Sequence, residues 1–268
     1  MSTVLKLEHV TKRFSGLVAV NDLSLEMQSR TIHSLIGPNG SGKSTTVNMI
    51  SGAIPATSGD IWHKDQQISG LPSYKVAQTK MCRTFQNLKL FHSMTVMENL
   101  MVGMTMNMNQ GLVPFLFDLS KARREETAMR EKAKEILNFI NLYSLRDEYV
   151  DNLPYGKQKM TELGRALMNG PELLLLDEPA AGLNPSERVE FVNILLKVFE
   201  SGIDLFLIEH NMDVVMNISN TITVINFGAK IAEGTPKEIQ EDPSVIKAYL
   251  GERYKRQTAN GGADSAQG

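Results

Sequence analysis

The sequence predicts an α/β protein with a mostly parallel sheet, an antiparallel β subdomain and an inserted all-helical subdomain. Three observations predict it. A glycine-rich run at 37–45 stands between an apolar segment and a segment that can continue as a helix. Two later runs, 173–176 and 203–208, are apolar except for Asp204, as expected for strands covered on both faces. The segment 185–201 between them is a predicted helix, and such strand–helix alternation is typical of parallel sheets.

The antiparallel subdomain is predicted from the N-terminal third of the chain. Residues 4–10 alternate apolar and polar side chains, residues 19–27 do something similar, and 59–63 form a further short strand. Together with the buried strand at 31–36, these segments predict an antiparallel layer beside the glycine-rich loop.

The helical insert begins near residue 87, where the pattern changes. Thr95-Val-Met-Glu98 is a capping box that opens a helix. The segment 121–141 is charged and apolar at helical spacing, with one apolar face formed by Ala133, Ile136, Leu137 and Ile140. The methionine-rich piece at 101–109 fits adaptable packing better than a metal site. We therefore expect a helical subdomain at about 87–155, inserted in a domain of residues 1–254.

Composition narrows the class of protein and its location. The chain has 268 residues, 42% apolar and 22% charged, with a net charge of −2, so it can bury a core and has no excess charge for nucleic acid. The single cysteine, Cys82, excludes a disulfide framework and suits a reducing compartment. With no run of 18 apolar residues and no signal-peptide pattern, we expect a cytoplasmic protein that reaches a membrane only through a partner. The polar tail at 255–268 is predicted to be disordered.

The glycine-rich run carries the clearest chemistry. It fits G-x-x-x-x-G-K-[ST] in full, as Gly37, Pro38, Asn39, Gly40, Ser41, Gly42, Lys43, Ser44 and Thr45. Glycines let backbone N–H groups wrap a phosphate chain, and the helix N-terminus adds positive partial charge. We expect Lys43 to reach the β- and γ-phosphates and the Ser44 hydroxyl to bind Mg²⁺. A glycine-rich turn that binds nothing is the alternative.

Polar side chains follow the predicted buried strands. Asp177 and Glu178 end the first, where ligands bind in open α/β folds. Asp177 is placed to hold Mg²⁺ and Glu178 to accept a proton from the attacking water; the alternative is a helix cap and a solvated acid. His210 ends the second strand and can contact the γ-phosphate, although such a histidine alone is more often structural. Gln86, after the strand-like 82–85, can offer an amide to Mg²⁺ or water, a weak signal by itself.

A last element, Leu153-Pro-Tyr-Gly-Lys157, leads into a helix. Lys157 and Lys159 lie in or near its first turn, where cations oppose the helix dipole. An anion docking there and a solvated basic face are equally compatible with these residues.

Taken together, these residues resemble the ATP-binding subunits of ABC transporters along about residues 4–253. The resemblance implies a P-loop NTPase fold and the cofactors ATP and Mg²⁺. It also implies that Phe14 stacks on adenine, that Gln86 is the Q-loop glutamine, that 181–184 is the D-loop and that His210 is the switch histidine. The signature differs: Leu153-Pro154-Tyr155-Gly156-Lys157 replaces Leu-Ser-Gly-Gly-Gln, so the serine hydroxyl is missing. Tyr155 and Gly156 then remain to approach a partner's nucleotide.

Within that family the sequence is similar to branched-chain amino acid importers. The tyrosine of the signature, the run Asp177-Glu-Pro-Ala-Ala-Gly-Leu-Asn-Pro185 and the ending 234–251 indicate this. Urea or amide importers and the lipopolysaccharide-export ATPase are similar enough to stay possible, as are non-transport ATPases and a regulatory nucleotide binder. The resemblance implies a second ATPase subunit, membrane permease subunits, an external binding protein and a position on the inner face of the membrane.

Overall fold

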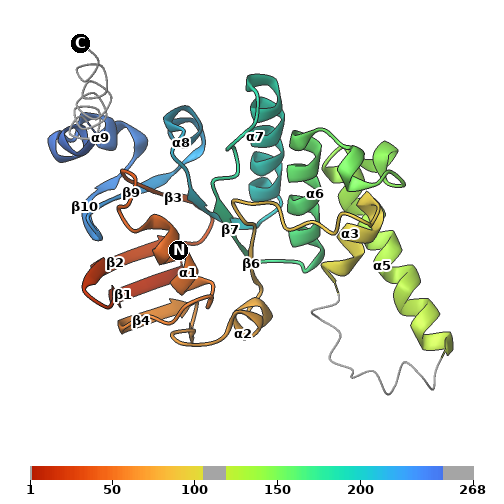
Figure 1. Cartoon of the computed structure of the whole chain (residues 1–268), viewed down its shortest axis with the longest axis horizontal. Coiled ribbons are helices and arrows are strands. Elements are labelled where there is room, and N and C mark those ends of the chain that lie inside the picture. The colour runs from red at the N-terminus through yellow and green to blue at the C-terminus, as the bar shows by residue number, and fades with distance from the viewer. Residues whose placement is uncertain (1, 105–118, 250–268) are drawn as a thin grey trace, which may run out of the picture. The chain divides into compact units, whose positions relative to one another are not determined.

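The computed structural model describes residues 2–104 and 119–249, in two compact units. One unit comprises Met1–Leu71 with Phe206–Gly268, and the other comprises Pro72–Leu205. Each is described by itself below (Figure 1). The predicted tail at 255–268 and part of the methionine-rich piece lie outside the described residues.

The first unit contains an antiparallel sheet with the strand order β2-β1-β4-β5. Its strands are β1 (Thr3–Phe14), β2 (Leu17–Gln28), β4 (Ser58–His63) and β5 (Gln66–Gln67). Side chains that alternate along β1 and β2 are buried, among them Leu5, Leu7, Leu23, Leu25 and Met27. The antiparallel subdomain predicted from this alternation is confirmed.

A second sheet in the same unit holds the strand that precedes the glycine-rich loop. β3 (Ile32–Ile36) pairs in parallel with β9 (Thr221–Asn226), and β9 pairs antiparallel with β10 (Ala229–Gly234). The prediction that the strand at 31–36 joins the antiparallel layer is therefore wrong. All five residues of β3 are buried, and a strand covered on both faces belongs in the parallel sheet.

Three helices of the first unit accompany this sheet. α1 (Lys43–Ile50) follows β3 through the glycine-rich loop. α8 (Met212–Ile218) and α9 (Pro236–Glu241) contribute Val215 and Ile239 to an apolar cluster with Ile36, Ile222 and Val224. β8 (Asp204–Ile208) is buried along its whole length, and the boundary between the units falls within it.

The second unit combines a parallel strand pair with helices. β6 (Met81–Arg83) lies parallel to β7 (Leu173–Asp177), with α2 (Ser73–Gln78) before β6 and α7 (Pro185–Glu200) after β7. This parallel pair, in which β7 is buried along its whole length, confirms the predicted α/β class.

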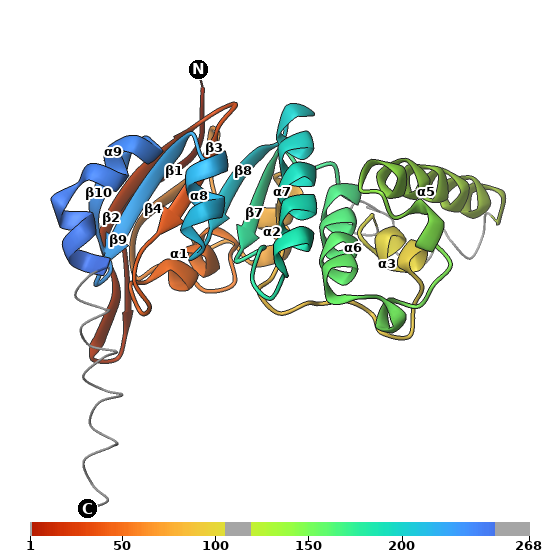
Figure 2. The same ribbon diagram turned by 90° about the horizontal axis from the view of Figure 1, so that it is seen from above.

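The helical part of this unit is formed by α3 (Val96–Val102), α5 (Leu119–Phe139) and α6 (Tyr155–Met168), which lie side by side (Figure 2). The short 3₁₀ helices η2 (Tyr143–Leu145) and η3 (Val150–Asn152) connect α5 to α6. Leu100, Leu137, Ile140 and Leu163 form its buried core. A Cβ on Gly164 would lie 2.7 Å from Ile140 Cδ1, so glycine lets the chain after α5 approach α6.

The capping box at the start of α3 is confirmed, because Thr95 Oγ1 accepts from the Glu98 N–H and the Glu98 carboxylate accepts from the Thr95 N–H. The boundaries 87–155 of the helical subdomain stay a prediction. Within residues 2–104 and 119–249, no helix is both long and apolar enough to cross a bilayer.

Candidate functional site

The glycine-rich loop of the first unit is shaped by close backbone packing. A Cβ on Gly37 would lie 2.1 Å from the Ile225 carbonyl oxygen, and one on Gly42 would lie 2.5 Å from the Ala19 carbonyl oxygen. Gly42 also has a φ of 106°, which L side chains rarely adopt, and it is the N-cap of α1. These positions therefore need glycine, and the loop delivers the chain to a helix N-terminus suited to an anion.

The side chain of Lys43 folds back onto the backbone of this loop. It is only 7% exposed, and its Nζ donates to the carbonyl oxygens of Gly37 at 2.7 Å and Pro38 at 2.9 Å. Ser44, the next residue of the helix, is exposed. The ammonium of Lys43 thus donates to neutral carbonyl acceptors of the loop. An anionic phosphate would bind the same ammonium more strongly than these carbonyl groups do.

Two other predicted residues of the first unit have defined surroundings. Phe14 ends β1, is 45% exposed, and has Lys12 Nζ 5.0 Å from its ring centroid. An exposed aromatic face of this kind suits stacking on a base. His210 is exposed just beyond β8, and the fully buried Glu209 accepts hydrogen bonds from the backbone N–H groups of His210 and Asn211. Glu209, which the sequence did not single out, fixes the backbone at this histidine.

In the second unit, Asp177 lies at the end of β7 with its two carboxylate oxygens in different situations. Oδ2 accepts from Arg83 Nη2 at 2.7 Å, and both side chains are nearly buried. Oδ1 is buried and has no hydrogen-bond partner in the part of the chain that the structure describes. A buried carboxylate oxygen is costly without a partner, and a hard cation or its water would satisfy it. The residues present therefore fit Mg²⁺ at this position.

Glu178 stands next, in an unusual backbone conformation. Its φ is 48°, in the left-handed region that a residue with a Cβ seldom occupies. Its Oε2 accepts a hydrogen bond from Gln86 Nε2 at 2.8 Å. The structure thus brings together the predicted proton acceptor and the predicted glutamine, through a hydrogen bond between their side chains.

The signature segment packs against the turn that follows β7. α6 begins at Tyr155, and Pro154 at its N-cap makes no side-chain cap hydrogen bond. A Cβ on Gly156 would lie 2.9 Å from the Glu187 side chain, and one on Gly182 would lie 2.8 Å from the Tyr155 ring. Tyr155 therefore covers the predicted D-loop of its own chain.

The two lysines of the first turns of α6 differ. Lys157 Nζ lies 2.7 Å from Glu190 Oε1. Lys159 is 4% exposed, so a solvated basic face is wrong for this residue; its Nζ donates to the carbonyl oxygens of Glu178 and Pro179. Sequence spacing placed both on the first turns, but it could not show which one points into the protein.

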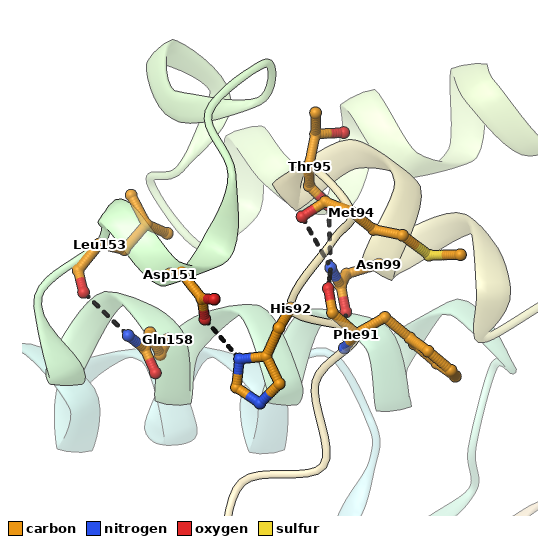
Figure 3. A network of polar contacts seen from close by, with 8 residues as sticks. All are labelled: Phe91, His92, Met94, Thr95, Asn99, Asp151, Leu153 and Gln158. Atoms are coloured by element: carbon orange, nitrogen blue, oxygen red, sulfur yellow. Dashed lines mark hydrogen bonds and ion pairs between the residues drawn. The ribbon is translucent and has the colours of Figure 1, made fainter.

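The loop after Gln86 is held by side chains of α3 and α6, and Figure 3 shows the contacts that Asn99 of α3 makes. Asn99 is fully buried; its Oδ1 accepts from the Phe91 N–H at 2.9 Å, and its Nδ2 donates to the Phe91 carbonyl at 3.1 Å. From α6, Glu162 accepts from the Lys89 N–H and Arg165 donates to the Lys89 carbonyl. Burial raises the pKa of Glu162, and these N–H contacts and Arg165 oppose that rise. Phe91 itself stays 46% exposed at the tip.

Sequence reasoning missed Arg83, Asn99 and Glu162, and it left open whether Lys159 is buried or solvated. A usable signal existed for Arg83, since an arginine within a short buried strand requires a buried acid nearby. In residues 2–104 and 119–249, no three His, Cys, Asp or Glu residues gather as a metal cluster.

Known proteins match this chain along most of its length. The family model described as "ABC transporter" matches residues 20–181, and one described as "Branched-chain amino acid ATP-binding cassette transporter" matches residues 229–255. The high-affinity branched-chain amino acid transport ATP-binding protein BraF of Pseudomonas aeruginosa is 42% identical over 250 residues, covering 93% of this chain and 98% of that protein. LivG of Escherichia coli, described in the same words, is 41% identical with the same coverage.

A solved structure shares the fold. The ADP conformation of MJ1267, an ATP-binding cassette of an ABC transporter, has a TM-score of 0.82 and 32% sequence identity, and the match covers 94% of this chain and 100% of that one.

Proposed function

Because this chain belongs to the ABC transporter family of ATPases, we propose that it is the ATP-hydrolysing subunit of an importer for branched-chain amino acids. The observation that best supports hydrolysis lies at the end of β7. There, one carboxylate oxygen of Asp177 is buried and has no hydrogen-bond partner among the described residues, and Glu178 is the next residue. The solute class is supported by the names of BraF and LivG and by the match at residues 229–255.

The phosphate loop binds the nucleotide in this proposal. Lys43 exchanges the carbonyls of Gly37 and Pro38 for the β- and γ-phosphates, and the backbone of 37–45 surrounds them. Phe14 stacks on the adenine. Ser44 and Asp177 would each offer an oxygen to Mg²⁺, and the ion would neutralise negative charge that develops on the transferred phosphate.

Glu178 acts as the general base in this proposal. The carboxylate takes a proton from the attacking water, and Gln86 holds that carboxylate through the 2.8 Å hydrogen bond. His210 orients water at the γ-phosphate. Tyr155 and Gly156 approach the nucleotide of a second ATPase subunit.

The partners in this proposal are that second subunit, two membrane permease subunits and an external binding protein. The chain would then lie on the inner face of the membrane. The loop 85–95 is the contact with a permease subunit, since Phe91 is exposed while its backbone is held by Asn99. Cysteines at the exposed positions Phe91, His92 and Ser93 should cross-link to a permease subunit, with cysteines in 221–249 as the comparison. The neighbouring Leu90 and Met97 are buried, so cysteines there should cross-link poorly. Cross-links from that comparison region alone would move the contact elsewhere.

The decisive test of hydrolysis is Glu178→Gln. The amide keeps the shape of the side chain and loses the base, so ATP turnover should fall by about 10²–10⁴-fold with ATP affinity retained. Bound ATP and Mg²⁺ should then hold two ATPase chains together in size-exclusion chromatography, and ADP should not. Wild-type turnover in this variant would show that Glu178 is not the base.

The solute is tested separately. The chain, reconstituted in proteoliposomes with the permease and binding-protein subunits encoded beside it, should drive ATP-dependent uptake of leucine, isoleucine or valine. Urea and short amides are the comparison solutes. Uptake of urea with no uptake of leucine would replace the amino-acid assignment and leave the ATPase assignment intact.

A further inference from the structure

The backbone around Glu178 needs support from outside the turn. With a φ of 48°, Glu178 occupies a region that is disfavoured for a residue with a Cβ. Such a conformation persists only where surrounding contacts hold it. Gln86 donates a hydrogen bond to its carboxylate, but a side-chain hydrogen bond alone does not fix the peptide groups on either side of Cα.

Lys159 supplies contacts to those peptide groups. From α6, its Nζ donates to the Glu178 carbonyl oxygen at 3.1 Å and to the Pro179 carbonyl oxygen at 3.0 Å. One ammonium thus bridges two successive carbonyls, one of them belonging to the residue with positive φ. Charge-assisted hydrogen bonds are stronger than neutral ones, and this pair lies in a buried place where water competes little.

Tyr155 completes this arrangement. Its ring centroid lies 5.6 Å from Lys159 Nζ, within range of a cation–π contact. The same ring lies against Gly182, where a Cβ would approach to 2.8 Å. The lysine, the ring and the turn 178–182 therefore pack as one cluster, so a change at Lys159 acts first on the turn that carries Glu178.

We propose that Lys159 is a positioning residue for ATP hydrolysis, which holds the backbone of Glu178 and Pro179 so that the Glu178 carboxylate is directed at the attacking water. This inference rests on the proposed role of Glu178 as the general base. Lys159 does not contact the nucleotide of its own chain in this role. Its effect on turnover passes through Glu178, and nucleotide affinity is independent of it.

The test compares Lys159→Met with Lys159→Arg in the full chain. Because a displacement of about 1 Å at a catalytic group can lower the rate about 100-fold, we expect kcat of Lys159→Met to fall by about 10- to 100-fold with ATP affinity unchanged. Arginine, which keeps the charge and the donors, should restore most of kcat. Lys134→Met is the matched control, because Lys134 is a partly exposed α5 residue paired with Glu131, and it should leave kcat unchanged.

A double-mutant cycle separates positioning from a general structural role. Lys159→Met added to Glu178→Gln should give no further loss of turnover, since the two changes remove the same function. If Lys159→Met does not fold, Lys159→Gln, a neutral donor, should fold and show a kcat between those of the wild type and Glu178→Gln.

Unchanged kcat in a folded Lys159→Met or Lys159→Gln variant would overturn the inference, and so would a parallel loss of ATP affinity or a full additional loss in the Glu178→Gln background. If Glu178→Gln itself keeps turnover, the proposed base is wrong, and that failure is distinguishable from a failure at Lys159.

Discussion

Asn99→Ala tests whether one buried amide organises the loop proposed to meet the permease. Asn99 lies on α3 with no exposed surface, and its amide contacts the backbone of Phe91 in both directions (Figure 3). The same Nδ2 lies 3.0 Å from the Thr95 carbonyl oxygen and 3.4 Å from that of Met94. Alanine removes all of these contacts and leaves the fold of α3 otherwise unchanged, because alanine is the best helix former.

The expected loss follows from the three shorter hydrogen bonds, with donor–acceptor distances of 2.9, 3.0 and 3.1 Å. At about 0.5–1.5 kcal/mol each, they sum to about 1.5–4.5 kcal/mol. Since Phe91 is 46% exposed, water can reach the released groups and reduce the loss, so we expect about 2–3 kcal/mol. That value corresponds to an open loop populated about 30- to 150-fold more often, at about 1.4 kcal/mol per factor of ten.

Hydrogen exchange of the amides at 88–95 measures this opening directly. Exchange there should accelerate in Asn99→Ala, while exchange in β1 and β2 should not change. Asn138→Ala is the control, because Asn138 is exposed and donates one hydrogen bond to its own helix. Unchanged exchange at 88–95 in Asn99→Ala, or an equal change in Asn138→Ala, would refute the reasoning. In the assembled transporter, Asn99→Ala should also lower cross-linking from a cysteine at position 91 and leave ATP affinity unchanged.

Three further predictions concern nucleotide binding, pH and the signature. Lys43→Ala should weaken ATP binding and abolish turnover, since it removes a cation from the developing charge; near-normal turnover would contradict the assignment of the loop. Burial lowers the pKa of His33 to about 4 in the folded protein, so the unfolded chain binds a proton at a higher pH than the folded chain does. The free energy of unfolding should therefore fall by about 2 kcal/mol when the pH is lowered from 7 to 5. Urea unfolding of His33→Gln should lack that part of the pH dependence, and an unchanged dependence would show that other groups cause it. Pro154→Ser restores a hydroxyl worth at most about 1.5–3 kcal/mol beside a charged group; if the proline limits the site completed by this signature, the ATPase rate of the assembled complex should rise, and an equal rate would show that the proline is silent.

Local signals explain what the sequence predicted correctly. The glycine-rich loop lies between a continuous apolar run and a helix, and the capping box at Thr95 needs only residues three apart. An apolar run followed by two acids was enough to predict that Asp177 and Glu178 lie at the end of a strand, without knowledge of the residues that surround them. In each case the interacting atoms lie within a few residues of one another, where propensity and periodicity are informative.

Non-local pairings explain what it missed. β3 has its parallel neighbour in β9, with His33 opposite Thr221, and nothing near residue 33 indicates that partner. Arg83 and Asp177 are 94 residues apart in sequence. The burial of Lys159 depends on a turn that begins 19 residues later in the sequence. From its position on a first helical turn alone, an exposed side chain and an anion-binding one were equally compatible. These contacts are decided by packing, which a single sequence does not display.

α6 links the turn at Glu178, the proposed base, to the loop 85–95, called the docking loop here, within the second unit. Lys159 contacts the backbone at Glu178, whereas Glu162 and Arg165, one and two turns further along, contact the backbone at Lys89. Residues three apart share a helix face, so these contacts arise from a single side of α6. If the docking loop moves relative to the base, at least one of these buried polar contacts must break, which is costly. We therefore expect α6, the turn at Glu178 and the loop 85–95 to move together. Under the proposed function, a permease that displaces this loop would also displace Glu178.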